Sequence, residues 1–334
     1  YLQNVKEDNE VVTGKENDWD LFQSYLDSND IIHDEIRHIE KDLIGKINYE
    51  MERLRLQQRG LELKEIKAKA PYDEIKTKRQ SLQDDYDVLT KKLEKLYLQF
   101  NKASITATTA EGNTVEIPLS KIVRAYRPNA MSQLQRFGFY FIKLWEFMSD
   151  DPREANTEGG IFPAIFGTVL MVMLMALIVT PFGVVAAVYL HEYAKQGPLT
   201  RLIRIAVNNL AGVPSVVYGV FGLGFFVYFL GGSIDELFYP EALPTPTFGT
   251  PGLMWASLTL AILTVPVVIV ATEEGLSRVP RALREGSLAL GATKAETLWR
   301  TVMPMTASAI MTGMILAIAR AAGEVAPLML VGVV

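Results

Sequence analysis

The chain has 334 residues, of which 49% are hydrophobic, and its formal net charge is −5. The acidic balance argues against a nucleic-acid partner, and the lack of cysteine excludes disulfides, thiolate chemistry and cysteine zinc sites. The charges are unevenly divided, since only nine basic and nine acidic residues follow residue 160, of 33 and 38 in the whole chain. The sequence therefore predicts a water-facing domain over 1–150 and a bilayer domain over 151–334.

The two ends of the chain carry little pattern of their own. Residues 1–30 are acidic and lack a hydrophobic period, which predicts a loose segment. The chain begins at Tyr1 and stops at Val334 inside an apolar run, so we expect a fragment with further membrane segments beyond one or both ends.

Two amphipathic runs fill most of the first part. The first comprises Ile32, Ile36, Ile39, Leu43, Ile47, Met51 and Leu54, and the second comprises Leu82, Tyr86, Leu89, Leu93, Leu96 and Phe100. Both have helical spacing, the second follows a heptad, and Pro71 interrupts the pattern between them. We expect an antiparallel helical hairpin over about 32–100. A lone coiled-coil strand is less favoured, because the two apolar seams can bury each other.

Two shorter elements follow the hairpin. Residues 104–117 alternate β-forming residues around Glu111-Gly112-Asn113, which predicts a small β-hairpin. Residues 131–148 are aromatic and apolar but too short to span a bilayer, and they contain Lys143 and Glu146. They predict a helix lying at the membrane boundary, with a core helix of the first domain as the alternative. A polar linker over 149–160 leads into the bilayer domain.

Four long apolar segments predict four membrane spans, at about 162–190, 205–231, 253–272 and 306–331. Each can supply the roughly 20 residues needed to cross about 30 Å of hydrocarbon. The segments predict an all-α polytopic membrane protein, preceded by the helical-hairpin domain with its small β-hairpin.

The charges of the connections predict the orientation of these spans. The connections 191–204 and 273–300 are rich in Lys and Arg, whereas 231–252 carries three acidic residues and no basic one. By the positive-inside rule, the basic connections are cytoplasmic and the acidic one is external. The first domain then lies outside, which is the periplasm in a Gram-negative envelope.

The third connection, 273–304, predicts a helix–glycine–helix elbow on the cytoplasmic side. Pro280 suits a helix start, Gly291 breaks the helical pattern, and a second helical turn follows and ends near Pro304. An ordinary amphipathic loop is the alternative.

This elbow resembles the EAA loop of ABC-importer permeases. The match comprises Glu285, Gly286, Ser287, Gly291 and Pro304, and the resemblance implies that these residues and the adjacent Arg284 couple to an ATPase. Gly286 and Ser287 replace the two alanines of that motif, and Thr301 and Met303 replace the usual aliphatic residues before the proline. The resemblance implies a type I ABC importer permease whose elbow docks into a separate ATPase subunit. The chain itself has no phosphate-binding G-x-x-x-x-G-K-[ST] loop, so it needs an ATPase partner.

Arg320 and Glu324 carry charge inside the fourth apolar segment, four residues apart and so on one helix face. A charge at bilayer depth costs roughly 2.5–3.5 kcal/mol, so the pair should face a protein interior or a wet pathway. Arg320 could contact an anion in transit, since a guanidinium matches phosphate oxygens bidentately, while Glu324 would hold it when the anion is absent. A structural ion pair that locks helix packing is the alternative.

The residues around this pair resemble the phosphate permeases of the PstA type. Four stretches carry the resemblance: Ala319–Leu328, Asn156–Gly160, Tyr189–Tyr193 and Ala211–Gly219. It covers about residues 155–334 and leaves the insertion 1–150 unexplained. It implies three partners: a second (PstC-like) permease, a homodimeric (PstB-like) ATPase and a periplasmic (PstS-like) phosphate-binding protein.

Pro214 and Ser215 interrupt the second apolar segment, with Asn208 and Asn209 upstream. A broken helix can expose backbone groups to a pathway, and Ser215 is then a candidate for anion contact. A simple kink at Pro214 is the favoured alternative.

These observations favour a permease for phosphate, with import driven by ATP hydrolysis in a partner and no cofactor of its own. A permease for another oxyanion, such as molybdate or sulfate, and a membrane-anchored sensor or scaffold built on the hairpin are the alternatives. An enzyme is disfavoured, because the three histidines, His33, His38 and His191, form no ligand cluster and no nucleophile–base pair. We expect the hairpin domain to contact the binding protein or the second permease.

Overall fold

The computed structural model describes residues 2–7, 10–11, 18–66, 68–109, 111–150, 152 and 159–332. The chain forms two compact units, which divide between Phe139 and Tyr140, inside a helix rather than at residue 150. The predicted motif residues Asn156, Thr157 and Glu158 lie outside the described part of the chain.

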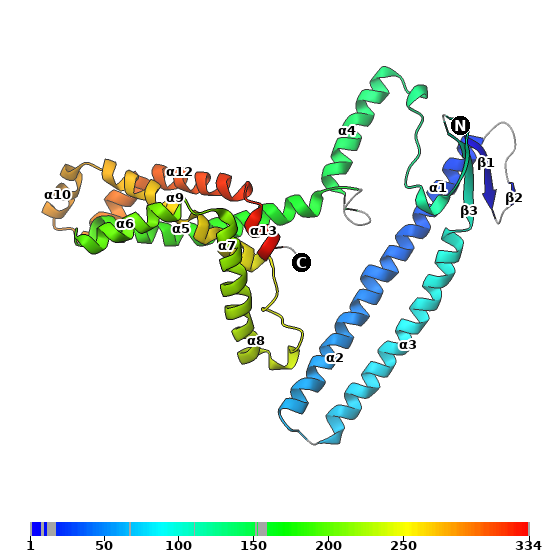
Figure 1. Ribbon diagram of the computed structural model, residues 1–334, viewed down its shortest axis with the longest axis horizontal. Coiled ribbons are helices and arrows are strands. Elements are labelled where there is room, and N and C mark those ends of the chain that lie inside the picture. Colours follow the sequence, from blue (N-terminus) through cyan, green and yellow to red (C-terminus); the bar gives the residue numbers. More distant parts are fainter. Residues whose placement is uncertain are drawn as a thin grey trace. The chain divides into compact units, whose positions relative to one another are not determined.

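Two long helices form the hairpin of the first unit (Figure 1). One arm is continuous through α1 (Asp18–Arg37), the π-helical η1 (His38–Ile44) and α2 (Gly45–Leu63). The other arm is α3 (Lys69–Phe100), whose 32 residues extend about 48 Å. The predicted seam is confirmed, because Ile36, Ile39 and Leu96 are buried together between the arms. The break lies at residues 64–68 and not at Pro71, which sits in the first turn of α3, where proline is tolerated.

A four-stranded antiparallel sheet caps this hairpin, in the order β2–β1–β3–β4. The predicted β-hairpin corresponds to β3 (Ala103–Thr108) and β4 (Thr114–Pro118), and β1 (Leu2–Glu7) and β2 (Glu10–Val11) extend it. The short helices η2 (Leu119–Lys121) and η3 (Pro128–Ala130) follow.

The prediction of a loose segment over 1–30 is wrong for the described residues. Phe22 and Leu26, one turn apart on α1, are almost fully buried against Ile105 and Leu119. Two apolar side chains at this spacing give the start of α1 a face to bury, although the acidic residues around them hide the period.

The last helix before the spans is α4 (Gln133–Ser149), and it buries none of its residues. Its end is joined to the start of α5, since Ile161 N–H donates to Phe147 O at 2.9 Å and Phe162 N–H to Asp150 O at 3.4 Å. A side chain at Gly160 would collide with Asp150 O. The end of α4 therefore lies beside the first residues of the first span.

Within the part of the chain that the structure describes, four helices are long and apolar enough to cross a membrane: Phe162–Tyr193, Ser215–Phe238, Leu253–Arg278 and Lys294–Ala322. The first comprises α5 (Phe162–Val188) and η5 (Tyr189–Tyr193), and the second comprises α7 (Ser215–Phe221), η6 (Gly222–Gly231) and α8 (Gly232–Phe238). The third is α9 (Leu253–Arg278), and the fourth comprises α11 (Lys294–Thr297), η8 (Leu298–Val302) and α12 (Met303–Ala322). The predicted number and kind of spans are confirmed.

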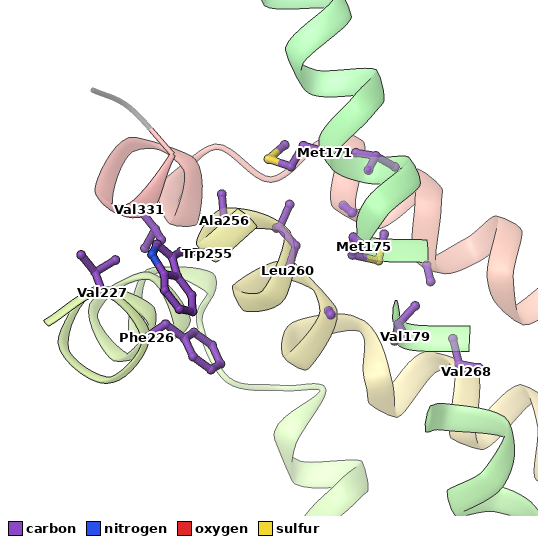
Figure 2. Close-up of a cluster of buried hydrophobic side chains, with 14 residues drawn as sticks. Met171, Met175, Val179, Phe226, Val227, Trp255, Ala256, Leu260, Val268 and Val331 are labelled. Carbon is purple, nitrogen blue, oxygen red and sulfur yellow. The ribbon is translucent and has the colours of Figure 1, made fainter. Parts of the chain in front are cut away.

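Helix α9 is the centre of the second unit. Its side chains pack with those of α5 and η6 in one cluster that includes Met175, Phe226, Trp255 and Leu260 (Figure 2). Close approach needs small residues: a Cβ at Gly275 would lie 2.5 Å from Ala309 Cβ, and one at Gly313 would lie 2.7 Å from Ala271 Cβ. Helix α12 can therefore run closely along α9.

The spans differ from the predicted boundaries at their charged ends. Helix α9 continues to Arg278, past the predicted end at residue 272, because Glu273, Glu274 and Arg278 occupy its last turns, where charges can reach water. The fourth span does not run to residue 331, because α12 ends at Ala322 and the separate α13 (Ala326–Val331) follows Gly323.

The ends of the second unit carry different elements (Figure 1). Helices α6 (Pro198–Leu210) and α10 (Arg281–Ala289) lie at one end of the α5–α9–α12 bundle. Helices α8 and α13 lie toward the other end, as does η7 (Pro240–Ala242).

Candidate functional site

The second apolar segment is broken into two separate helices, which is more than the predicted kink at Pro214. Helix α6 ends at Leu210, residues 211–214 form a turn, and α7 begins at Ser215 with Pro214 as its N-cap. The predicted span over 205–231 is therefore wrong at its start, because 205–210 belong to the amphipathic α6. Leu210 O, at the end of α6, accepts from Val213 N–H within the turn at 3.2 Å and from the Tyr218 hydroxyl at 2.6 Å.

Arg320 lies at the end of α12, beside this interruption. Its Nη2 donates to Ala211 O at 3.3 Å, and its Nε lies 3.7 Å from Glu324 Oε1. The Arg320 side chain is 30% exposed and that of Glu324 is 20% exposed. One guanidinium thus joins the end of α12 to the broken backbone between α6 and α7.

The four-residue spacing predicted that Arg320 and Glu324 share one helix face, but Glu324 lies beyond the end of the helix. Glu324 follows Gly323 in the turn between α12 and α13, and its backbone N–H donates to Ala321 O at 3.2 Å. The two side chains approach each other across the helix end. A carboxylate on a turn can move away from the guanidinium without unwinding a helix.

Ser215, the third predicted pathway residue, is half-buried at the first position of α7. Among the described residues, its hydroxyl makes no hydrogen bond with Arg320 or Glu324. Sequence reasoning missed Tyr218 and the Ala211 carbonyl. Tyr218 could have been noticed as a polar tip within an apolar run, one turn after Pro214; a carbonyl partner has no signal in the side-chain sequence.

The predicted elbow is present between α9 and α12. Helix α10 follows Pro280, Gly291 has a φ of +91°, and Thr293 and Glu296 form a capping box that starts α11. The φ of Gly291 explains why a glycine stands at the bend. The helix after the bend does not end near Pro304. Pro304 is exposed and lies just after the π-helical η8, inside the continuous helix Lys294–Ala322.

The elbow's motif residues face in two directions. Glu285, Gly286 and Gly291 are exposed, whereas the Ser287 hydroxyl lies 2.9 Å from that of Thr297 and so joins the two arms. Arg284 is turned inward, with its side chain 20% exposed.

The outer surface of the elbow is apolar for a loop. Leu283, Leu288 and Leu290 are 43%, 47% and 91% exposed, and α10 buries none of its residues. Exposed leucines gathered on one bend are typical of a surface that docks onto another protein.

Comparison with known proteins places the second unit in a transporter family. Residues 179–333 match the family described as the inner membrane component of binding-protein-dependent transport systems. A phosphate transport system permease protein PstA of Mycobacterium leprae is 36% identical over 199 residues, which are 58% of this chain and 60% of that protein. PstA 1 of Mycobacterium tuberculosis CDC 1551 is 38% identical over 175 residues, 52% of each chain.

A phosphate transport system permease protein PstC of Mesorhizobium japonicum is 31% identical over 226 residues, which are 65% of this chain and 67% of that protein. The chain thus spans only about half to two thirds of the length of these relatives. The matched residues contain the broken second span, the elbow and the Arg320–Glu324 pair. The chain belongs to the type I ABC permease family, the inner membrane components of binding-protein-dependent transport systems.

Proposed function

We propose that this chain is the permease subunit of an ATP-driven phosphate importer and forms half of its translocation pathway. Relatives that carry the names of phosphate permeases support this substrate. The observation that carries the proposal is the place of Arg320, a cation in the fourth span that is partly exposed and held by a backbone carbonyl and a carboxylate.

Arg320 has the chemistry for an oxyanion in transit. Ala211 O and Glu324 hold the guanidinium when no anion is bound, and phosphate oxygens would replace both acceptors through paired, charge-assisted hydrogen bonds. The Glu324 carboxylate, which would repel the anion, lies on a turn and can withdraw. The Ser215 hydroxyl, at the start of α7, would add a neutral donor.

The elbow would couple the permease to a separate ATPase. Its exposed leucines and the exposed Glu285, Gly286 and Gly291 supply the docking surface, and Ser287 and Pro304 shape the arms behind it. The complete transporter would contain a homodimeric ATPase, a second homologous permease and a periplasmic phosphate-binding protein. The first unit would lie in the periplasm, since the basic connections 191–204 and 273–300 favour the cytoplasm.

Labelled-phosphate uptake tests this proposal in a host that lacks its own phosphate permease. The host expresses the full-length parent with its cognate subunits, either as wild type or as Arg320→Gln, with Arg201→Gln, an exposed arginine on α6, as the control. We expect uptake by wild type and Arg201→Gln that sulfate and molybdate do not compete, and loss of uptake in Arg320→Gln while the subunits still copurify.

Each other outcome has a defined meaning. Uptake of sulfate or molybdate in place of phosphate would reassign the substrate within the oxyanions. Normal phosphate uptake by Arg320→Gln would return Arg320 to a structural role. If wild type moves no anion and the hairpin domain alone binds a partner, the chain is a membrane-anchored sensor or scaffold.

A further inference from the structure

A sheltered ion pair joins the elbow to the end of the first span. Arg284, on α10, places Nη1 2.6 Å from Oε1 of Glu192, which lies in η5 at the end of the first span. The two side chains are only 20% and 13% exposed. Exposed ion pairs contribute little to stability. Removing one partner of a sheltered pair is costly, because the other charge is left without its counterion.

Both arms of the elbow reach the same place. Arg284 Nη2 donates to Leu276 O, in the last turn of α9, at 2.6 Å. Lys294, the first residue of α11, donates from Nζ to the backbone oxygen of Glu192 and lies 4.5 Å from the centre of the Tyr193 ring. The end of the first span is therefore held by α10 on one side of Gly291 and by α11 on the other.

Neighbouring polar groups extend this connection. His191 Nδ1 lies 3.0 Å from the same Glu192 oxygen, and its Nε2 lies 3.3 Å from the Ser277 hydroxyl of α9. Arg204, on α6, pairs with Glu273 of α9 at 3.3 Å and donates to Leu190 O at 3.2 Å. The π-helical η5, the end of α9, the middle of α6 and the elbow thus form one polar cluster.

Helix α10 has few other attachments. It buries none of its side chains. Besides its chain connections to α9 and α11 and its contacts with α11 and η8, the side-chain bonds described for it are those of Arg284 and the Ser287–Thr297 hydroxyl pair. A push on the exposed leucines of the elbow would reach the third and fourth spans along the chain itself, but it would reach the first span through the contacts of Arg284 and Lys294 with Glu192.

We propose that the Glu192–Arg284 pair is the joint through which movement of the elbow is passed to the first span. The proposal rests on the proposed function, in which an ATPase drives the elbow. Arg284 is then a transmitting residue behind the docking surface rather than part of it. Glu192 is its positioning partner.

The test measures phosphate transported per ATP hydrolysed by the complete transporter in proteoliposomes. The variants are Glu192→Gln, Arg284→Gln and the double variant. The matched control is Glu274→Gln, which changes an exposed carboxylate near the end of α9. We expect each single variant to lower the ratio about tenfold, which corresponds to about 1.4 kcal/mol of coupling, and the double variant to be no worse. Glu274→Gln should keep the wild-type ratio.

The conservative Arg284→Lys variant distinguishes a role of the ion pair in coupling from a role in folding alone. It keeps a cation for Glu192 but loses the paired donors that also reach Leu276 O, so we expect a ratio between those of wild type and Arg284→Gln. A wild-type ratio in the single variants, or losses that multiply in the double variant, would overturn the proposal. So would variants that lower assembly and uptake together at an unchanged ratio. A wild type that moves no phosphate would instead count against the proposed function.

Discussion

Asp235 shows how one buried carboxylate can organise a loop of this protein. Its side chain is fully buried at the end of the second span, where it accepts N–H bonds from Phe248 at 2.9 Å and from Gly249 at 2.6 Å. Phe248 O in turn accepts from Trp255 Nε1 at 2.7 Å. Backbone donors that have been taken out of water need such an acceptor, so Asp235 fixes the loop between α8 and α9 onto both helices.

Removing this carboxylate should loosen the loop. Asp235→Ala leaves the two N–H groups without an acceptor, at an expected cost of about 1–3 kcal/mol. Thermal unfolding of the purified protein in detergent should show a lower midpoint, and limited proteolysis should cut 243–252 faster. Glu236→Ala, an exposed neighbour, is the control, and equal behaviour of the two variants would contradict this role.

Some residues of the candidate site could be predicted from the sequence, and others could not. Arg320 and Glu324 could be singled out because charges within an apolar run are costly. The Ala211 carbonyl, which accepts from Arg320, could not be singled out, because a side-chain pattern gives no sign of a backbone acceptor until the break between α6 and α7 is known. The inward turn of Arg284 was equally hidden, because spacing along a short helix does not say which face is covered.

At the scale of elements, α4 exposes its apolar side chains while its C-terminal end is hydrogen-bonded to the start of the first span. Its large apolar side chains point outward on several sides, among them Leu134 at 87% and Trp145 at 72% exposed. Its C-terminal end is hydrogen-bonded to Ile161 and Phe162, where the first span begins. A bilayer would cover these side chains at the level where α5 enters it, so we expect α4 to lie in the membrane interface.

Tryptophan fluorescence tests this position of α4. In a variant that keeps Trp145 and replaces Trp19, Trp255 and Trp299 by Phe, lipids brominated near the headgroup end of the acyl chain should quench the emission. A variant that keeps only Trp19, in the first unit, is the control and should not be quenched. Unquenched Trp145 emission would favour the alternative, a helix covered by protein.

Element patterns were most predictable where one face alone is buried. The heptad from Leu82 to Phe100 predicted α3 because its apolar seam follows the 3.5-residue repeat. The boundary between α6 and α7 was missed because residues 205–231 carry no charged side chain, although α6 is amphipathic and the turn at 211–214 separates the two helices. The start of α1 was missed for the opposite reason, since only two apolar residues, Phe22 and Leu26, hold it.

At the scale of the whole molecule, the charge of the connections fixes the expected orientation. The acidic connection 231–252 lies toward one end of the spans, and the basic connections 191–204 and 273–300 lie at the other. The first unit precedes the first span and should therefore share the side of the acidic loop.

Cysteine labelling in intact cells checks this orientation, because the chain contains no cysteine of its own. We expect a membrane-impermeant thiol reagent to label Ser81→Cys, an exposed position on α3, without breaking the inner membrane. Lys195→Cys, in the first basic connection, should react only after permeabilisation. The reverse pattern would place the first unit in the cytoplasm.

Phosphate import by the purified transporter tests the central claim most directly. The complete complex is reconstituted into vesicles with ATP on the ATPase side, and labelled phosphate and the binding protein are added on the other. We predict ATP-dependent accumulation of phosphate, with no accumulation of labelled sulfate or molybdate under the same conditions. An assembled complex that hydrolyses ATP but accumulates no phosphate would contradict the account.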